Sequence, residues 1–149
     1  MCMIPPMVTA LKLACEAAEA GEVPVGAVLS NDDGVVFATA RNYVEQEQNP
    51  AAHAEMLVLA QAWAVRGGKY FTDCTLTVTM EPCVLCAGAI AAFRVGKLVF
   101  GAYDPKSGAV EHGPRVFTHA STHHKPEIVG GVREAECSAL LRAFFANKR

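Results

Sequence analysis

Short β-rich runs alternate with helical stretches along most of the chain, and this alternation limits the possible folds more than any other feature. Two early β-rich runs, 25–29 and 35–40, are separated by the turn residues 31–34 and predict a hairpin. The remaining patterns predict strands at 75–80, 97–102 and 127–129 and helices at 7–20, 54–66, 82–93 and 133–146. An opening hairpin followed by such alternation predicts an α/β fold with three layers, α/β/α, on a mixed five-stranded sheet.

The length and composition indicate an ordinary domain of a reducing compartment. The 149 residues are expected to form a single domain, 1–149. Charged residues interrupt every long apolar run, so no segment reaches the roughly 20 apolar residues that span a bilayer, and no membrane partner is expected. Residues 1–7 lack the basic flank of a signal peptide. We therefore expect a cytoplasmic protein whose six cysteines stay reduced.

Three potential metal ligands, His53, Cys83 and Cys86, lie at the starts of two predicted helices. The chain reads Ala-His-Ala-Glu at 52–55 and Glu-Pro-Cys-Val-Leu-Cys at 81–86. Cysteines three residues apart in a first helical turn share one face, and the unpaired N–H groups there favour the thiolate form. A catalytic zinc ion takes three protein ligands and leaves its fourth position to water. The pattern therefore predicts one catalytic Zn²⁺ per chain.

Glu55 follows the histidine by two residues and is the candidate proton carrier. In the first turn of its own helix, its carboxylate can point at the water that a catalytic zinc activates and pass the proton to a leaving group. Taken one at a time, these residues have other interpretations: His53 as a capping or core residue, Glu55 as a solvated acid, and Pro82 as a helix-start residue. A structural zinc site would need a fourth ligand and no proton carrier.

The two segments together resemble the cytidine deaminase superfamily, whose zinc-dependent base deaminases carry the signature His-x-Glu with Pro-Cys-x-x-Cys. The resemblance narrows to TadA-type tRNA adenosine deaminases at 22–28, Asn42, 79–83, 99–108 and 139–145, and it extends over about residues 7 to 149. It implies a cytidine-deaminase-like fold. It also implies a homodimer that converts the wobble adenosine of a tRNA anticodon to inosine by zinc-dependent hydrolytic deamination.

The same resemblance implies that six further residues bind the anticodon stem-loop. The first two would meet the target nucleoside, the middle two the RNA near the pocket mouth, and the last two the anticodon loop: Asn42, Ala54, Asp104, Lys106, Phe145 and Arg149. Ala54 would act through a backbone hydrogen bond to the base. Structural alternatives are open for four of them. Asn42 follows a strand and could be a turn residue, Asp104 and Lys106 could build a turn around Pro105, and Phe145 could belong to the core.

The segment 103–125 is long, irregular and rich in histidine. Loops of this length without regular structure are often functional. Four of the five histidines of the chain lie here, and because the zinc already has three ligands we expect them to be loop or interface residues: His112, His119, His123 and His124. The segment 108–124 departs from the best-known bacterial relatives, as do Asn49, where relatives usually carry an acid, and Ala51, where they often carry threonine.

Two other functions compete with RNA editing. A deaminase of a free base or nucleotide, such as cytosine, guanine or dCMP, needs no basic surface, and the pI of about 6.2 suits it. Against this, the aromatic pair Phe144–Phe145 is followed by Lys148 and Arg149, a combination that suits unpaired RNA bases. The other competitor is a catalytically silent deaminase-fold subunit or structural zinc protein, which would have no use for Glu55.

Overall fold

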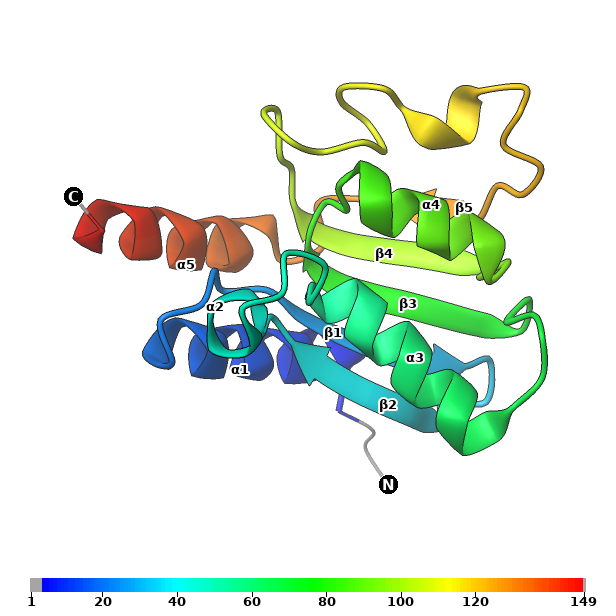
Figure 1. Ribbon diagram of the computed structural model, residues 1–149, viewed down its shortest axis with the longest axis horizontal. Helices are drawn as coiled ribbons and strands as arrows, with labels where there is room; N and C mark the ends of the chain where they lie inside the picture. Colours follow the sequence, from blue (N-terminus) through cyan, green and yellow to red (C-terminus); the bar gives the residue numbers. More distant parts are fainter. Residues whose placement is uncertain (1–3, 149) are drawn as a thin grey trace.

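Residues 4–148 are described by a computed structural model, so the predicted RNA contact Arg149 lies outside the described residues. Within 4–148, five strands form one sheet in the order β2-β1-β3-β4-β5 (Figure 1). Their bounds are β1 Gly26–Asn31, β2 Val36–Arg41, β3 Cys74–Met80, β4 Lys97–Ala102 and β5 Glu127–Val129. The strand β1 is antiparallel to β2 and β3, whereas β3, β4 and β5 are parallel. The predicted mixed sheet is confirmed.

The opening hairpin is closed by its own turn residues. The side-chain Oδ1 of Asn31 accepts hydrogen bonds from the N–H groups of Asp33 at 3.0 Å and Val35 at 2.9 Å. Gly34 adopts φ 83°, a left-handed conformation that costs glycine little. This turn sets the register of β1 against β2 and confirms the predicted hairpin.

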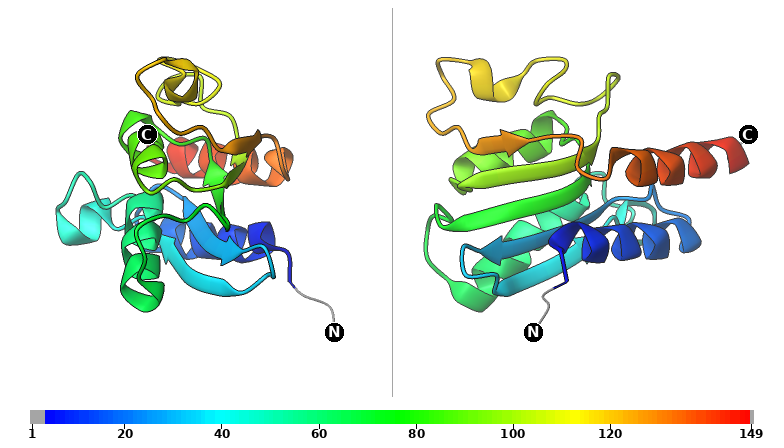
Figure 2. Two further views of the ribbon diagram at one scale, coloured as in Figure 1. Left: turned by 90° about the vertical axis from the view of Figure 1, so that its right-hand side faces the viewer. Right: turned by 180° about the vertical axis from the view of Figure 1, so that it is seen from behind.

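Helices cover both faces of the sheet and confirm the three-layer prediction. The helices α1 (Pro6–Glu19) and α5 (Glu134–Asn147) lie on one face, and α3 (Ala54–Arg66) and α4 (Val84–Ala92) lie on the other (Figures 1 and 2). Two short elements were not predicted: α2 (Val44–Glu47) and the 3-10 helix η1 (Val116–Thr118). Both are too short to show a helical period in the sequence.

Side-chain alternation along the strands builds a hydrophobic core on each face. On β1, Ala27 and Leu29 join the core under α3 and α4, while Val28 joins the smaller core under α1 and α5. Complete burial of a side chain such as Leu29 stabilises the fold by about 1.5–3 kcal/mol. The larger core also contains Leu76 and Phe100 of the central strands. It therefore fixes where α3 and α4 begin, and the predicted zinc ligands lie at those two points.

The segment between β4 and β5 leaves the sheet and passes over its β5 edge (Figure 1, yellow). Apart from η1 it lacks helices and strands in the described chain, as predicted for 103–125. No helix within residues 4–148 has the length and apolarity needed to cross a membrane.

Candidate metal centre and substrate pocket

The predicted metal ligands lie where two neighbouring helices begin. His53 is the N-cap of α3, and Cys83 is the N-cap of α4 just beyond the carboxyl end of β3. Among the described residues, neither side chain makes the hydrogen bond by which an N-cap usually closes its own helix. Both side chains are therefore available to a ligand, and Cys86, one turn into α4, is fully buried beside them.

The three donor atoms have the spacing that a zinc ion requires. His53 Nδ1 lies 3.3 Å from Cys86 Sγ and 3.5 Å from Cys83 Sγ, and all three atoms lie within 4.8 Å of one another. Tetrahedral zinc, with bonds of about 2.0 Å to nitrogen and 2.3 Å to sulfur, would place such a pair roughly 3.6 Å apart. The residues present fit Zn²⁺ with three protein ligands and an open fourth position.

The ionisation of the thiols also suits a metal site. Hydrogen bonding from Cys86, together with that from His53, lowers the pKa of Cys83 to about 4 although burial opposes it. The hydrogen bond with Cys83 and burial raise the pKa of Cys86, so that thiol keeps its proton until a metal replaces it. The hydrogen bond with Cys83 is also the main reason why the pKa of His53 is raised.

Glu55 is buried next to the metal donors and is not one of them. The close donor group within residues 4–148 consists of His53, Cys83 and Cys86 alone. Only 5% of Glu55 is exposed, and burial raises its pKa to about 7. The interpretation of Glu55 as a solvated acid is therefore wrong. A carboxyl group that titrates near neutrality is able both to take up and to release a proton.

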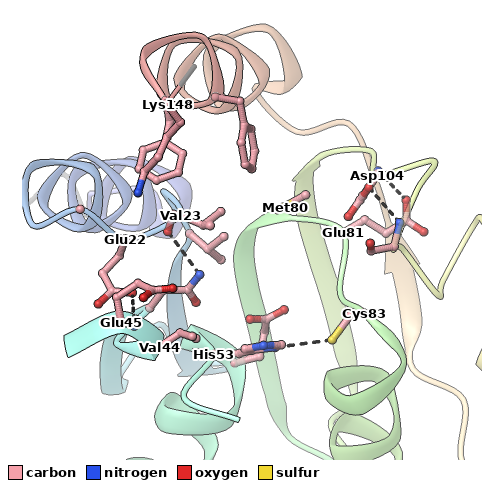
Figure 3. A pocket seen from close by; sticks show the side chains of 17 residues that line it. Glu22, Val23, Val44, Glu45, His53, Met80, Glu81, Cys83, Asp104 and Lys148 are labelled. Atoms are coloured by element: carbon pink, nitrogen blue, oxygen red, sulfur yellow. Dashed lines mark hydrogen bonds between the residues drawn. The ribbon is translucent and has the colours of Figure 1, made fainter. Parts of the chain in front are cut away.

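The metal donors open into a cavity of about 510 Å³, a volume within the usual range for small-molecule sites. Figure 3 shows that its lining comes from segments far apart in the sequence, including the start of α3, the end of β3 and the last turns of α5. The lining includes Glu22, Val23, Asn42, Glu45, His53, Glu55, Glu81, Cys83, Asp104, Ser107, Phe144, Phe145 and Lys148.

Asn42 joins three segments at the base of this cavity. Its Nδ2 donates to the carbonyl of Val23 at 3.2 Å, and its Oδ1 accepts the N–H of Ala54 at 2.8 Å. Asn42 is thus more than a turn residue, because it ties the loop before β1 to the start of α3. Ala54 is fully buried, and its N–H already has an acceptor, so a contact with a base would have to share that donor.

Asp104 and Lys106 behave differently although they are neighbours. Asp104 lines the cavity, and its Oδ1 accepts the N–H groups of Lys106 and Ser107, each at 3.1 Å. The turn interpretation is therefore correct for Asp104, which also faces the pocket. Lys106 is exposed, and Ser107 rather than Lys106 contributes to the described cavity lining.

The last turns of α5 bring aromatic and basic groups to the cavity. Phe144 and Phe145 meet edge to face with ring centres 5.3 Å apart, and the Lys148 ammonium lies 5.1 Å from the centre of the Phe144 ring. Phe145 is 51% exposed, so the alternative that it is a core residue is wrong. All three residues line the same cavity as Glu55.

Two buried carboxylates in the pocket walls were missed by the sequence reasoning. Glu22 accepts the N–H groups of Glu45 at 3.0 Å and Gln46 at 2.8 Å and so holds α2 against the loop before β1. Glu81 accepts hydrogen bonds from the segment after β4; burial alone raises its pKa, but these bonds bring it below its usual value. The sequence signal that could have indicated their burial is an acidic residue next to an apolar run: Glu22 stands before Val23, and Glu81 follows Met80.

The histidines of the long segment are not part of the metal centre. His112 Nδ1 lies 2.9 Å from Glu81 Oε1. The Nε2 atoms of His119 and His124 lie 2.5 Å and 2.6 Å from the carbonyl oxygens of Pro114 and Val95. The expectation that these residues belong to the loop, and not to the ligand group found within residues 4–148, is confirmed.

Comparison with known proteins agrees with this geometry. The family model for the cytidine and deoxycytidylate deaminase zinc-binding region matches residues 5–102. The tRNA-specific adenosine deaminase of Bacillus subtilis (strain 168) is 46% identical over 143 residues, which cover 96% of this chain and 88% of that protein.

Two solved structures are also similar. A tRNA:A34 deaminase studied for A-to-I editing at the wobble position has a TM-score of 0.88 and 41% identity, over 91% of this chain and 98% of that one. The guanine deaminase of Bacillus subtilis has a TM-score of 0.61 and 37% identity, over 66% of this chain and 62% of that one. The matched zinc-binding region and the extended identity show that this chain belongs to the cytidine and deoxycytidylate deaminase family, in the branch of the tRNA-specific adenosine deaminases.

Proposed function

We propose that this protein hydrolyses the wobble adenosine of a tRNA anticodon to inosine and releases ammonia. The observation that carries the proposal is the position of Glu55, a buried carboxyl with a pKa of about 7, in one cavity with the zinc donors and with Phe145. The zinc donors and Glu55 supply hydrolytic chemistry, while an exposed aromatic ring at the same opening suits an unpaired base. The relatives named as tRNA-specific adenosine deaminases support this substrate.

The residues divide the reaction between them. Zn²⁺ held by His53, Cys83 and Cys86 supplies a Lewis acid that makes water nucleophilic near neutral pH. Glu55 takes one proton from the attacking water and delivers it to N1 of the purine ring; it then takes the second proton from the new C6 hydroxyl group and delivers it to the departing amine. Water adds at C6, the C6–N bond breaks, and adenosine plus water gives inosine plus ammonia.

The substrate contacts are assigned from the resemblance to TadA-type deaminases, and the cavity lining supports three of them, Asn42, Asp104 and Phe145. Asn42 and the Ala54 backbone lie beside Glu55 and are assigned to the target nucleoside. Asp104 and exposed Lys106 are assigned to the RNA at the pocket mouth. Phe145, with Arg149 beyond the described residues, is assigned to the anticodon loop, where the ring offers a stacking surface.

The proposal extends to assembly and location. Residues 1–149 act as one deaminase domain, and two copies form a homodimer. Val84 and Leu85, in the first turn of α4 next to the zinc ligands, are 60% and 43% exposed, and large exposed apolar side chains are common at subunit interfaces. The site of action is the cytoplasm, because the reaction needs tRNA.

A second candidate is deamination of free guanine, which the likeness to a guanine deaminase favours. The cavity of about 510 Å³ would accept a free base as readily as a flipped one. Cytosine and dCMP belong to the same alternative class. A catalytically silent role fits poorly, because it gives no reason to bury Glu55 beside the zinc donors.

One assay separates these candidates. The zinc-loaded protein is incubated with an anticodon stem-loop that carries adenosine at the wobble position, and inosine is measured after nuclease digestion. A matched stem-loop with guanosine at that position is the control. We expect inosine from the first RNA and no ammonia from guanine, cytosine or dCMP. Ammonia from a free base with no inosine from RNA would replace the proposal by the alternative.

A further inference from the structure

A buried carboxylate, Glu81, lies between the zinc-ligand turn and the segment that follows β4. It comes directly after β3 and two residues before Cys83, and none of its side chain is exposed. Buried ionised carboxylates are almost always paired, because an unpaired buried charge is very costly. Its partners therefore show which part of the molecule it holds in place.

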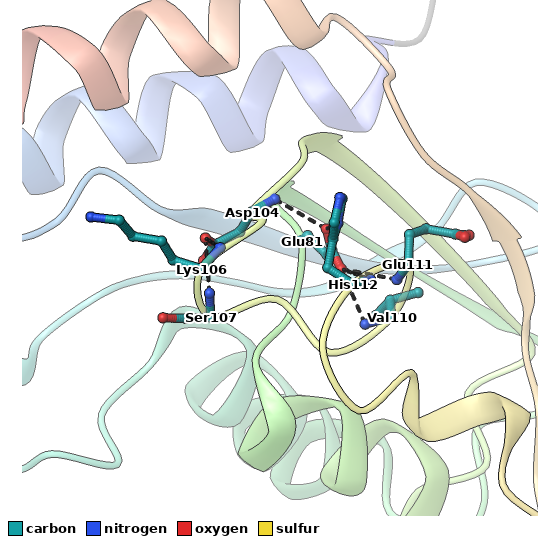
Figure 4. Close-up of polar contacts among 7 residues, drawn as sticks. All are labelled: Glu81, Asp104, Lys106, Ser107, Val110, Glu111 and His112. Carbon is teal, nitrogen blue, oxygen red and sulfur yellow. Dashed lines mark hydrogen bonds and ion pairs between the residues drawn. The ribbon is translucent and has the colours of Figure 1, made fainter.

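Five hydrogen-bond contacts converge on the two oxygens of Glu81 (Figure 4). Oε2 accepts the backbone N–H groups of Val110 at 3.1 Å, Glu111 at 2.9 Å and His112 at 3.2 Å. Oε1 accepts the N–H of Asp104 at 3.0 Å and contacts the His112 ring at 2.9 Å. Because both oxygens already accept hydrogen bonds, Glu81 is unsuited to carry protons. Its effect is to hold the segment 104–112 in place.

That segment is one wall of the substrate pocket, and we call residues 104–112 the Glu81 wall. Asp104 and Ser107 of this wall line the cavity. The wall wraps closely around the carboxylate: a Cβ added to Gly108 would lie 2.4 Å from the Asp104 carbonyl oxygen and 2.5 Å from Glu81 Cδ. The position of Asp104 relative to the metal donors therefore depends on Glu81.

We infer that Glu81 is a positioning residue for the deaminase reaction. Glu81 holds the Glu81 wall against the zinc-ligand turn and so keeps Asp104 where it can contact the RNA. This inference rests on the proposed function. His112 is the second part of the same tether, because it adds its ring to the bond from its own N–H. The metal donors begin α3 and α4, which pack in the larger core, and the bond from the Ala109 N–H to the carbonyl of Pro82 does not involve the Glu81 side chain. Loosening the contacts of Glu81 is therefore expected to affect substrate binding more than the chemical step.

Glu81→Gln is the direct test. Glutamine has the same shape, but one oxygen becomes an NH₂ group, so at least two of the present donors would face another donor. We expect KM for the stem-loop to rise about tenfold or more while kcat changes less than about threefold. Zinc should remain at one ion per chain. A purely structural role would lower zinc content and kcat together and leave KM unchanged, and that result would overturn the inference.

Glu127→Gln is the matched control. It removes the same charge from an exposed residue of β5, outside the Glu81 wall and outside the described cavity lining, and within the described residues its side chain makes no hydrogen bond or ion pair. We expect wild-type KM. If Glu81→Gln does not fold, Gly108→Ala replaces it, since the added methyl group pushes the wall away from the carboxylate without changing charge. An unchanged KM in Gly108→Ala would then overturn the inference.

Hydrogen exchange separates this inference from the proposed function. In Glu81→Gln, or in Gly108→Ala if needed, the amides of 110–112 should exchange at least about tenfold faster than in wild type, because they lose their buried acceptor. The amides of α4 should keep their protection. If wild type makes no inosine, the proposed function fails, and exchange alone decides the inference. Unchanged protection at 110–112 overturns it in either case.

Discussion

The floor and the mouth of the pocket are built in opposite ways. The floor consists of buried or half-buried groups at helix starts: His53, Glu55, Cys83 and Cys86. The mouth consists of exposed or partly exposed groups on a loop and a helix end: Asp104, Phe144, Phe145 and Lys148. The floor is fixed by the large hydrophobic core under α3 and α4, whereas the mouth depends on tethers such as Glu81.

This difference indicates that the floor carries out the chemical step and the mouth binds the RNA. Chemistry needs atoms placed to within a fraction of an ångström, and a packed core provides that precision. Recognition of an RNA loop needs exposed rings and charges that meet a flexible partner. Changes at the floor should therefore reduce kcat or the metal content, and changes at the mouth should raise KM.

The largest effect is expected from Cys86→Ala. Removing the buried thiolate leaves two ligands, which is too few to retain zinc against dilution. We expect a zinc content near zero and no measurable inosine. Metal analysis after gel filtration checks this prediction, and a variant that kept one zinc and its activity would exclude Cys86 as a ligand.

Glu55→Ala should separate chemistry from metal binding. We expect the zinc content to stay at one per chain and kcat to fall about 10²- to 10⁴-fold, the range for loss of a general acid–base group. Metal analysis and kcat are measured on the same preparation. Loss of zinc from this variant would mean that Glu55 is a ligand and not a proton carrier.

Phe145→Ala tests the mouth. Loss of one base–aromatic stack costs about 1–3 kcal/mol, which corresponds to a rise in KM of about 5- to 150-fold at similar kcat. The matched control is Trp63→Ala, which removes another exposed aromatic ring, 57% exposed on α3 and outside the described cavity lining. Equal KM values in the two variants would remove Phe145 from the RNA contact.

The smallest effect concerns the pH dependence of zinc binding by the floor. Because the pKa of Cys86 is raised, its thiol is protonated near neutral pH and must release that proton when zinc binds. Cys83, with a pKa of about 4, is already a thiolate. The raised pKa of His53 adds to this proton release, so zinc affinity should rise at least about tenfold per pH unit between pH 7 and 8. Competition with a chelator measures this slope, and a flat profile would contradict the assignment.

The floor could be predicted from the sequence because its information is local. His53 and the Cys83–Cys86 pair stand at helix starts that the sequence marks by the onset of apolar periodicity and by Pro82. The predicted bounds 54–66 for α3 and 97–102 for β4 agree with the structure. Where periodicity was too short, as in the four residues of α2, the element was missed.

The walls could not be predicted because their information is not local. Glu22 and Glu81 bind backbone N–H groups that lie 23 to 31 residues away, and every residue except proline offers such a group. No pattern of residue types in the sequence therefore indicates which N–H groups a buried carboxylate such as Glu81 will bind. The exposure of Phe145 was also open in the sequence, since an aromatic residue on the last helix fits a core as well as a binding site.

The division between floor and mouth is tested most directly by the rate of inosine formation in a single turnover, measured against enzyme concentration on the anticodon stem-loop. We predict that Glu55→Ala lowers the saturating rate and leaves the half-saturating concentration unchanged. Phe145→Ala should raise the half-saturating concentration and leave the saturating rate unchanged. If both variants lower the saturating rate and neither moves the half-saturating concentration, the two regions share one task, and the division proposed for this pocket is wrong.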